Sequence, residues 1–76
     1  MKRYAIYYSD GNGACYYVPS RRDPGHFVVT YSDRYAYLHG WGSNEEACDG
    51  AALLVEKEAG SWPAAWRIRI AEIEER

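Results

Sequence analysis

Two cysteines and two histidines are the residues of this chain that could bind a metal ion. Cys15, His26, His39 and Cys48 supply the donor types of a structural zinc site. Such sites usually take their ligands in close pairs, whereas these four stand singly, without a C-x-x-C spacing. We therefore predict no metal site and interpret both cysteines as buried thiols, since Cys48 falls on the apolar face of a predicted helix. A disulfide is the alternative, and it would require an oxidising compartment.

The side chains needed for catalysis do not form a recognisable motif. A nucleophilic Cys48 would need His39 as its base and a third group to orient that base. The acidic pair Glu45 and Glu46 fits the start of a helix better than a site of acid–base chemistry. Residues 10–13, Asp-Gly-Asn-Gly, lack the later ligands of a calcium loop and the lysine of a phosphate loop. We predict that the protein is not an enzyme and has no cofactor.

The chemistry that the sequence favours is recognition by tyrosine and arginine side chains. The 76 residues include 8 Tyr, 3 Trp and 1 Phe. A tyrosine ring buries apolar area while its hydroxyl stays in contact with water, and both residue types are enriched where proteins bind proteins or stacked bases. The predicted contact residues are aromatic or arginine, in turns or on strand positions expected to be uncovered: Tyr7, Tyr16, Arg21, Arg22, Tyr35, Trp41 and Arg67. The alternatives are that the turn arginines serve solubility and that Trp41 is a lid over the core.

Short aromatic and β-branched runs predict the sheet that positions these residues. The glycines of residues 10–13 favour a hairpin between the first two runs, and Pro19 ends the second. Residues 21–25 are typical of an exposed turn, with Gly25 in the left-handed position. The predicted strands are residues 3–8, 14–18, 26–31, 35–39 and 65–70.

One helix is predicted between the last two strands. Ser43 is its N-cap and Glu46 completes a capping box, while Gly60 ends it. At helical spacing, alanines together with Leu54 form an apolar face opposite a charged one, and Leu53 points to the charged side. The predicted fold class is therefore α+β: an antiparallel four- to five-stranded sheet with one helix packed on one face, in the order β-β-β-β-α-β. The other sheet face is expected to be exposed.

Composition and length limit the type of protein. The 76 residues are 47% apolar and 26% charged, which is typical of a single small globular domain spanning residues 1–76. The net charge is −2. Residues 1–40 are basic overall and residues 41–76 are acidic overall, which weakens the case for bulk nucleic-acid binding. There is no long apolar run and no signal-peptide pattern, so a cytoplasmic protein without a membrane partner is expected.

Several motifs resemble the N-terminal part of HicB-like antitoxin domains. They are Tyr-Ala-Ile-Tyr-Tyr at residues 4–8, Tyr-Tyr-Val-Pro at 16–19, Pro-Gly at 24–25, and Gly-Ser-Asn-Glu-Glu-Ala at 42–47. The resemblance covers most of the chain and implies a non-catalytic inhibitor that docks onto a small ribonuclease toxin. Residues 26–41 are longer than the family's usual third strand. The family's common DNA-binding tail has no counterpart here, so the resemblance implies inhibitor docking and does not extend to operator binding.

The leading expectation is a small non-enzymatic inhibitor that binds a larger protein or ribonucleoprotein complex. An antitoxin and a phage inhibitor such as an anti-CRISPR protein, both typical of mobile elements, would share these features. The alternative is a single-stranded nucleic-acid binder, with bases stacked on tyrosines and phosphates bound by arginines. An exposed edge strand would also allow a homodimer.

Overall fold

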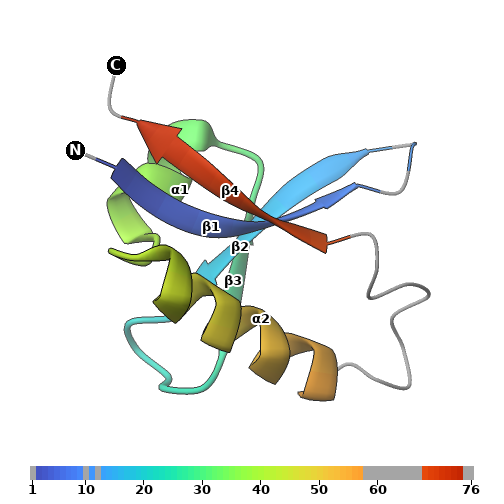
Figure 1. Ribbon diagram of the computed structural model, residues 1–76, viewed down its shortest axis with the longest axis vertical. Coiled ribbons are helices and arrows are strands. Elements are labelled where there is room, and N and C mark those ends of the chain that lie inside the picture. The colour runs from blue at the N-terminus through green and yellow to red at the C-terminus, as the bar shows by residue number, and fades with distance from the viewer. Residues whose placement is uncertain (1, 10, 12, 58–67, 75–76) are drawn as a thin grey trace.

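The computed structural model describes residues 2–9, 11, 13–57 and 68–74, and it has an α+β fold (Figure 1). Its four strands form one antiparallel sheet in the order β3-β2-β1-β4. No described helix is long and apolar enough to cross a membrane. The elements, in chain order, are β1 (Lys2–Ser9), β2 (Ala14–Pro19), β3 (Phe27–Thr30), α1 (Asp33–His39), α2 (Asn44–Lys57) and β4 (Ile68–Glu74).

The first three strands confirm the sequence-based prediction. The hairpin between β1 and β2 pairs Tyr7 with Tyr16. Gly11 and Gly25 have positive φ, 89° and 84°, as the turn chemistry requires. Pro19 is the last residue of β2 and pairs with Phe27 at the start of β3.

The predicted fourth strand, residues 35–39, is wrong, because this segment belongs to the helix α1. Alternating aromatic residues suggested a strand. Ser32, predicted as part of a turn, instead caps the helix, and its hydroxyl accepts a hydrogen bond from the Tyr35 amide at 3.2 Å. Ala36 is fully buried on the sheet, so helical spacing rather than alternation governs these residues.

The expectation of one helix on one face is also wrong, because a helix covers each face of the sheet. Residues that pair across antiparallel strands point to the same face, which places Ala5, Val18 and Ile73 together, packed on Ala36 of α1. Ile6 points to the opposite face. There Leu54 of α2 is buried, and α2 packs chiefly on β1 and β4. In the view of Figure 1, α1 lies behind β1 and β4.

The second helix begins where predicted. The Ser43 hydroxyl accepts a hydrogen bond from the Glu46 amide at 3.1 Å. Leu53 is exposed, as expected, but Cys48 is also exposed, which contradicts the prediction of a buried thiol. The predicted C-cap Gly60 lies outside the described residues. The last strand continues through the acidic residues to Glu74 rather than ending at Ile70, because β1 pairs with it along its whole length.

Candidate functional site

The potential metal ligands and catalytic groups do not converge. Within the described residues, no group of three or more His, Cys, Asp or Glu side chains could hold a metal ion. Cys15 and Cys48 are not joined by a disulfide. The His39 ring lies against Tyr35 with ring centroids 4.3 Å apart, on the α1 side of the sheet. Cys48 lies on α2, across the sheet from His39, so these two residues cannot act together on one substrate.

Tyr7 and Tyr16, two of the predicted contact residues, adjoin on the face of the sheet that carries α1. Their ring centroids are 5.5 Å apart and their planes are inclined by 58°. The register places Thr30 beside Tyr16 and Arg69 beside Tyr7, so one cross-strand row contains a residue from each strand. Because α1 has only 7 residues, it covers only part of this face. Both tyrosines are half-buried.

Arg21 and Tyr35 also lie on the α1 side. The Arg21 guanidinium donates a hydrogen bond to the Leu38 carbonyl at 3.1 Å, which ties the loop after β2 to the last turn of α1. Arg22 is exposed in the same loop. Tyr35 is 38% exposed on the helix. The structure therefore gathers Tyr7, Tyr16, Arg21 and Tyr35, which are distant in sequence, on one side of the molecule.

Trp41 lies on the other side and is half-buried. Its backbone forms an isolated antiparallel bridge with Tyr4 of β1. The Tyr4 amide donates to the Trp41 carbonyl at 2.9 Å, and the Trp41 amide donates to the Tyr4 carbonyl at 2.8 Å. The indole lies over Gly50 of α2 and 6.4 Å from the Phe27 ring. This position fits the lid interpretation of Trp41. The predicted contact residue Arg67 lies outside the described residues.

Sequence reasoning missed two exposed apolar residues beside these contacts. Tyr31, just before α1, is 81% exposed, and Leu38 is 50% exposed. Arg34 and Leu38 are one helical turn apart and point away from the sheet, opposite the buried Ala36. Helical spacing would have revealed this pair had residues 33–39 been assigned to a helix. We define the α1 patch as Arg21, Tyr31, Arg34, Tyr35 and Leu38.

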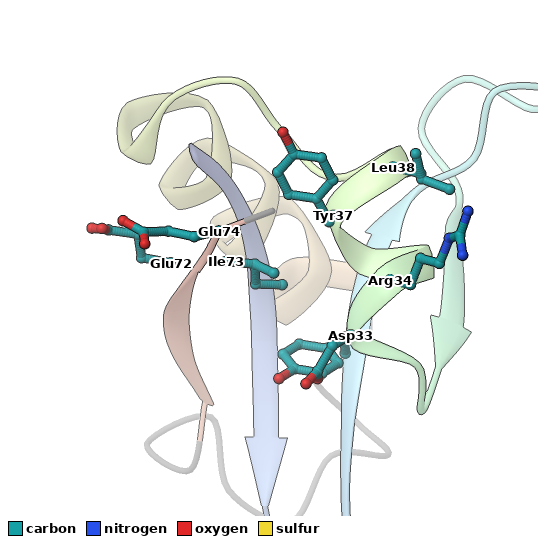
Figure 2. Close-up of a pocket in the computed structure, with 8 residues that line it drawn as sticks. Asp33, Arg34, Tyr37, Leu38, Glu72, Ile73 and Glu74 are labelled. Atoms are coloured by element: carbon teal, nitrogen blue, oxygen red, sulfur yellow. The ribbon is translucent and has the colours of Figure 1, made fainter. Parts of the chain in front are cut away.

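An open groove of about 800 Å³ runs beside α1, between the helix and β4 (Figure 2). Figure 2 shows Ile73 pointing toward α1, whereas Glu72 and Glu74 point away from it. In Figure 2, Arg34, on the helix, points away from β1 and β4. The charged side chains thus diverge, while an enzyme site or small-molecule site requires polar groups that converge on one point. The residues that line the groove are Tyr16, Asp33, Arg34, Tyr37, Leu38, Glu72, Ile73 and Glu74.

The two sides of the sheet differ in charge. Strand residues are assigned to sides by the register and helix residues by the face that the helix covers. The start of the loop after β2 is assigned to the α1 side by the Arg21 bond to Leu38, whereas the end of that loop contacts α2 through the hydrogen bond from Lys57 to the Gly25 carbonyl. The register places Arg69 beside Tyr7, on the α1 side. Among the described residues, the α1 side contains Arg3, Arg21, Arg22, Arg34 and Arg69 against Asp23 and Asp33, whereas the α2 side contains Lys2 and Lys57 against Glu45, Glu46, Asp49, Glu56, Glu72 and Glu74.

One ion pair on the α2 side is well defined. Lys2 Nζ lies 2.8 Å from Glu72 Oε1 and 3.9 Å from Glu74 Oε1. The hydrogen bond to Glu72, together with the charges of both glutamates, raises the pKa of Lys2. This pair fastens the start of β1 to the end of β4 and offsets part of the acidic charge there.

Comparison with protein-family models, curated proteins and solved structures finds no match to this chain. The resemblance to HicB-like antitoxin domains stays a prediction from the sequence.

Proposed function

We propose that this protein is a small non-enzymatic inhibitor that binds a larger protein, or a ribonucleoprotein complex, through the α1 side of its sheet. The observation that carries the proposal is the α1 patch, where Tyr31, Tyr35 and Leu38 are 81%, 38% and 50% exposed between arginines. Tyr35 and Leu38 lie on α1, and Tyr31 lies just before it. Exposed apolar side chains scattered singly need no explanation, but a cluster of them is typical of a docking surface.

The residue types of the α1 patch suit a protein partner. Tyrosine and arginine are enriched among the residues that dominate interface energy, because each buries a large area and keeps a polar end. Leu38 lies beside Arg34 on the exposed face of α1, where a partner would shield it from water. Arg21 holds the Leu38 carbonyl, so part of the surface is ordered before binding, which lowers the entropic cost of docking.

The groove supports a binding role rather than a catalytic one. Its carboxylates Glu72 and Glu74 point away from Asp33 and from the helix wall. A partner contacting α1 would therefore lie along an open channel rather than enter an enclosed pocket. We propose that the inhibitor is antitoxin-like or anti-CRISPR-like and acts in the cytoplasm. The sequence resemblance supports the antitoxin-like class, and an anti-CRISPR-like inhibitor would share the same sequence features.

A pair of exposed leucines on opposite sides of the sheet gives a matched test. Leu38 lies on α1 and Leu53, 37% exposed, lies on α2. The immobilised protein is incubated with extract of its source cells, and captured proteins are quantified by mass spectrometry for the wild type, Tyr35→Ala/Leu38→Ala and Leu53→Ala. We expect one partner to be retained by the wild type and Leu53→Ala and to fall at least about tenfold with the double variant. Equal capture by both variants would rule out the α1 side as the docking surface.

The alternative function, binding of single-stranded nucleic acid, is favoured by one observation. The row of Tyr7, Tyr16 and Arg69 offers two adjoining rings and a guanidinium group on one face. Fluorescence anisotropy with oligothymidylate tests it, using Tyr7→Leu and, as a control on the opposite face, Tyr17→Leu. This function requires affinity that falls steeply with salt and is weakened by Tyr7→Leu alone. Absent or salt-independent binding removes it.

A further inference from the structure

Among the described residues, basic side chains outnumber acidic ones on the α1 side, and acidic side chains outnumber basic ones on the α2 side. This difference bears on the chemistry of the partner. We infer that the α1 side docks onto an acidic protein surface, so that the acidic α2 side faces away from the partner. This inference rests on the proposed function and adds to it the charge of the partner and the orientation of docking.

Two of the arginines on the α1 side have no partner of their own. Arg22 and Arg34 are exposed and make no hydrogen bond or ion pair within the part of the chain that the structure describes. Arg34 adjoins the exposed Leu38, so any surface that covers the leucine also removes water from the guanidinium. A buried guanidinium without an opposite charge is costly, and hence the covering surface must supply carboxylates.

Charge elsewhere on the α1 side does little to offset these arginines. Within the part of the chain that the structure describes, Asp33 and Asp23 are the acidic residues assigned to it, and Arg3 and Arg69 add further positive charge. The Arg3 Nε atom is buried without a hydrogen-bond partner, and the register places Arg3 beside Ile73 on this same face.

The acidic residues of the α2 side are directed away from α1. Glu45, Asp49 and Glu56 lie on α2, across the sheet, and Figure 2 shows Glu72 and Glu74 pointing away from α1. A partner that touches α1 therefore encounters a basic surface, although the net charge of the chain is −2. Docking through α2 instead is disfavoured, because Glu45, Asp49 and Glu56 on that helix would repel an acidic partner.

Protein is favoured over nucleic acid by the apolar members of the α1 patch. A single-stranded nucleic acid could stack on tyrosines and neutralise arginines. It has little to pack on the aliphatic Leu38, which is 50% exposed in the last turn of α1. An acidic surface with an apolar centre matches both the arginines and the leucine.

A pair of peptides of opposite charge tests the inference directly. The acetylated hexapeptide Glu-Glu-Leu-Phe-Glu-Glu and its counterpart Lys-Lys-Leu-Phe-Lys-Lys are titrated into the ¹⁵N-labelled protein and followed by amide chemical shifts. We expect the acidic peptide to shift resonances of Asp33–His39 and of residues 20–25, and the basic peptide to leave them unchanged. Shifts from the acidic peptide on α2, or none at millimolar concentration, would overturn the inference.

Two single-charge variants provide the matched control. Arg34→Gln removes a positive charge from the α1 side, and Lys2→Gln removes one from the α2 side. Arg34→Gln should weaken the acidic peptide by about two- to fivefold, the effect of losing one exposed charge pair, while Lys2→Gln leaves its affinity unchanged. Equal weakening by both variants would show that only net charge matters, which contradicts the inference.

Oligothymidylate of matched charge completes the experiment. Tighter binding of the oligonucleotide than of the acidic peptide to the α1 side would overturn an acidic protein partner in favour of nucleic acid. These experiments can contradict the inferred charge of the partner without contradicting the proposed docking surface. If the acidic peptide does not bind but Tyr35→Ala/Leu38→Ala still abolishes partner capture, the docking surface stands and only the assigned charge of the partner is wrong.

Discussion

Gly50 is a helical residue whose missing side chain makes room for Trp41. A Cβ atom at this position would lie 2.5 Å from Trp41 Cζ2. The indole cannot easily retreat, because two backbone hydrogen bonds fasten Trp41 to Tyr4. The glycine therefore lets α2 approach the sheet closely despite the low helix propensity of glycine.

Gly50→Ala should destabilise the protein, although alanine is the better helix former. The clash is expected to lower the free energy of unfolding by about 1–3 kcal/mol, measured by urea denaturation. Gly13→Ala, where an added Cβ would meet nothing within 4 Å, is the control and should be nearly neutral. Trp41→Phe should reduce the cost of Gly50→Ala. A stabilising Gly50→Ala would mean that the indole does not lie over this residue.

The ion pair of Lys2 and Glu72 predicts a specific pH dependence. The pKa of Lys2 is raised in the folded state by its hydrogen bond to Glu72 and by the charge of that carboxylate. A raised pKa means that the pair contributes stability below the unfolded pKa of lysine and loses it as the pH rises through the folded value. The stability advantage of the wild type over Lys2→Met should be constant near neutral pH and begin to fall above about pH 10.4, the ordinary lysine value. It should vanish once the pH exceeds the raised pKa of Lys2 in the folded protein. An advantage that persists at higher pH would contradict this account.

At the scale of the elements, α1 is the least self-sufficient part of the fold. A helix of 7 residues is too short to be stable alone. It depends on the Ser32 cap and on the burial of Ala36 against the sheet. The Ser32 amide in turn donates to Thr30 Oγ1 at 3.1 Å, which links the cap to the end of β3.

Removing the cap should loosen α1 selectively. Ser32→Ala is expected to cost about 1 kcal/mol and to increase hydrogen exchange in α1 before α2. Ser32→Asp keeps an oxygen acceptor at the N-cap and should retain most of the stability. If both substitutions were equally destabilising, the Ser32 hydrogen bond to the Tyr35 amide would not be what holds the helix start.

The same helix shows where sequence patterns are ambiguous. The hairpin, the third strand and the start of α2 could be predicted, because glycines, Pro19 and the Ser43 cap are local signals. Tyr35-Ala36-Tyr37-Leu38-His39 satisfies an alternating pattern and a helical one equally well. Whether residues 35–39 form a strand or a helix is decided by the burial of Ala36 against strands that are distant in sequence. The residues around Ala36 do not indicate that contact.

At the scale of the whole molecule, few large side chains hold three layers together. Among described residues, Ile6 and Val18 are the largest that are fully buried, and they point to opposite faces of the sheet. Alanines fill much of the remaining contact, which lets both helices approach closely. The core is therefore thin on each side.

The candidate site could be predicted in part. Residue type alone selected Tyr7, Tyr16, Arg21 and Tyr35, which the fold places on one side. The same criterion selected Trp41, but its backbone bridge to Tyr4 places this residue on the α2 side. The sequence suggested a bare sheet face, whereas the exposed surface is built on a helix that lies over that face. The separation of charge by the sheet likewise depends on which side each helix covers.

The central claim is that the α1 side contacts a partner. Hydrogen exchange of the purified complex, compared with the free protein, measures this directly. Protection should increase in Asp33–His39 and in residues 20–25, and the exposed face of Asn44–Lys57 should exchange unchanged. Protection confined to α2, with α1 exchanging as in the free protein, would contradict the account.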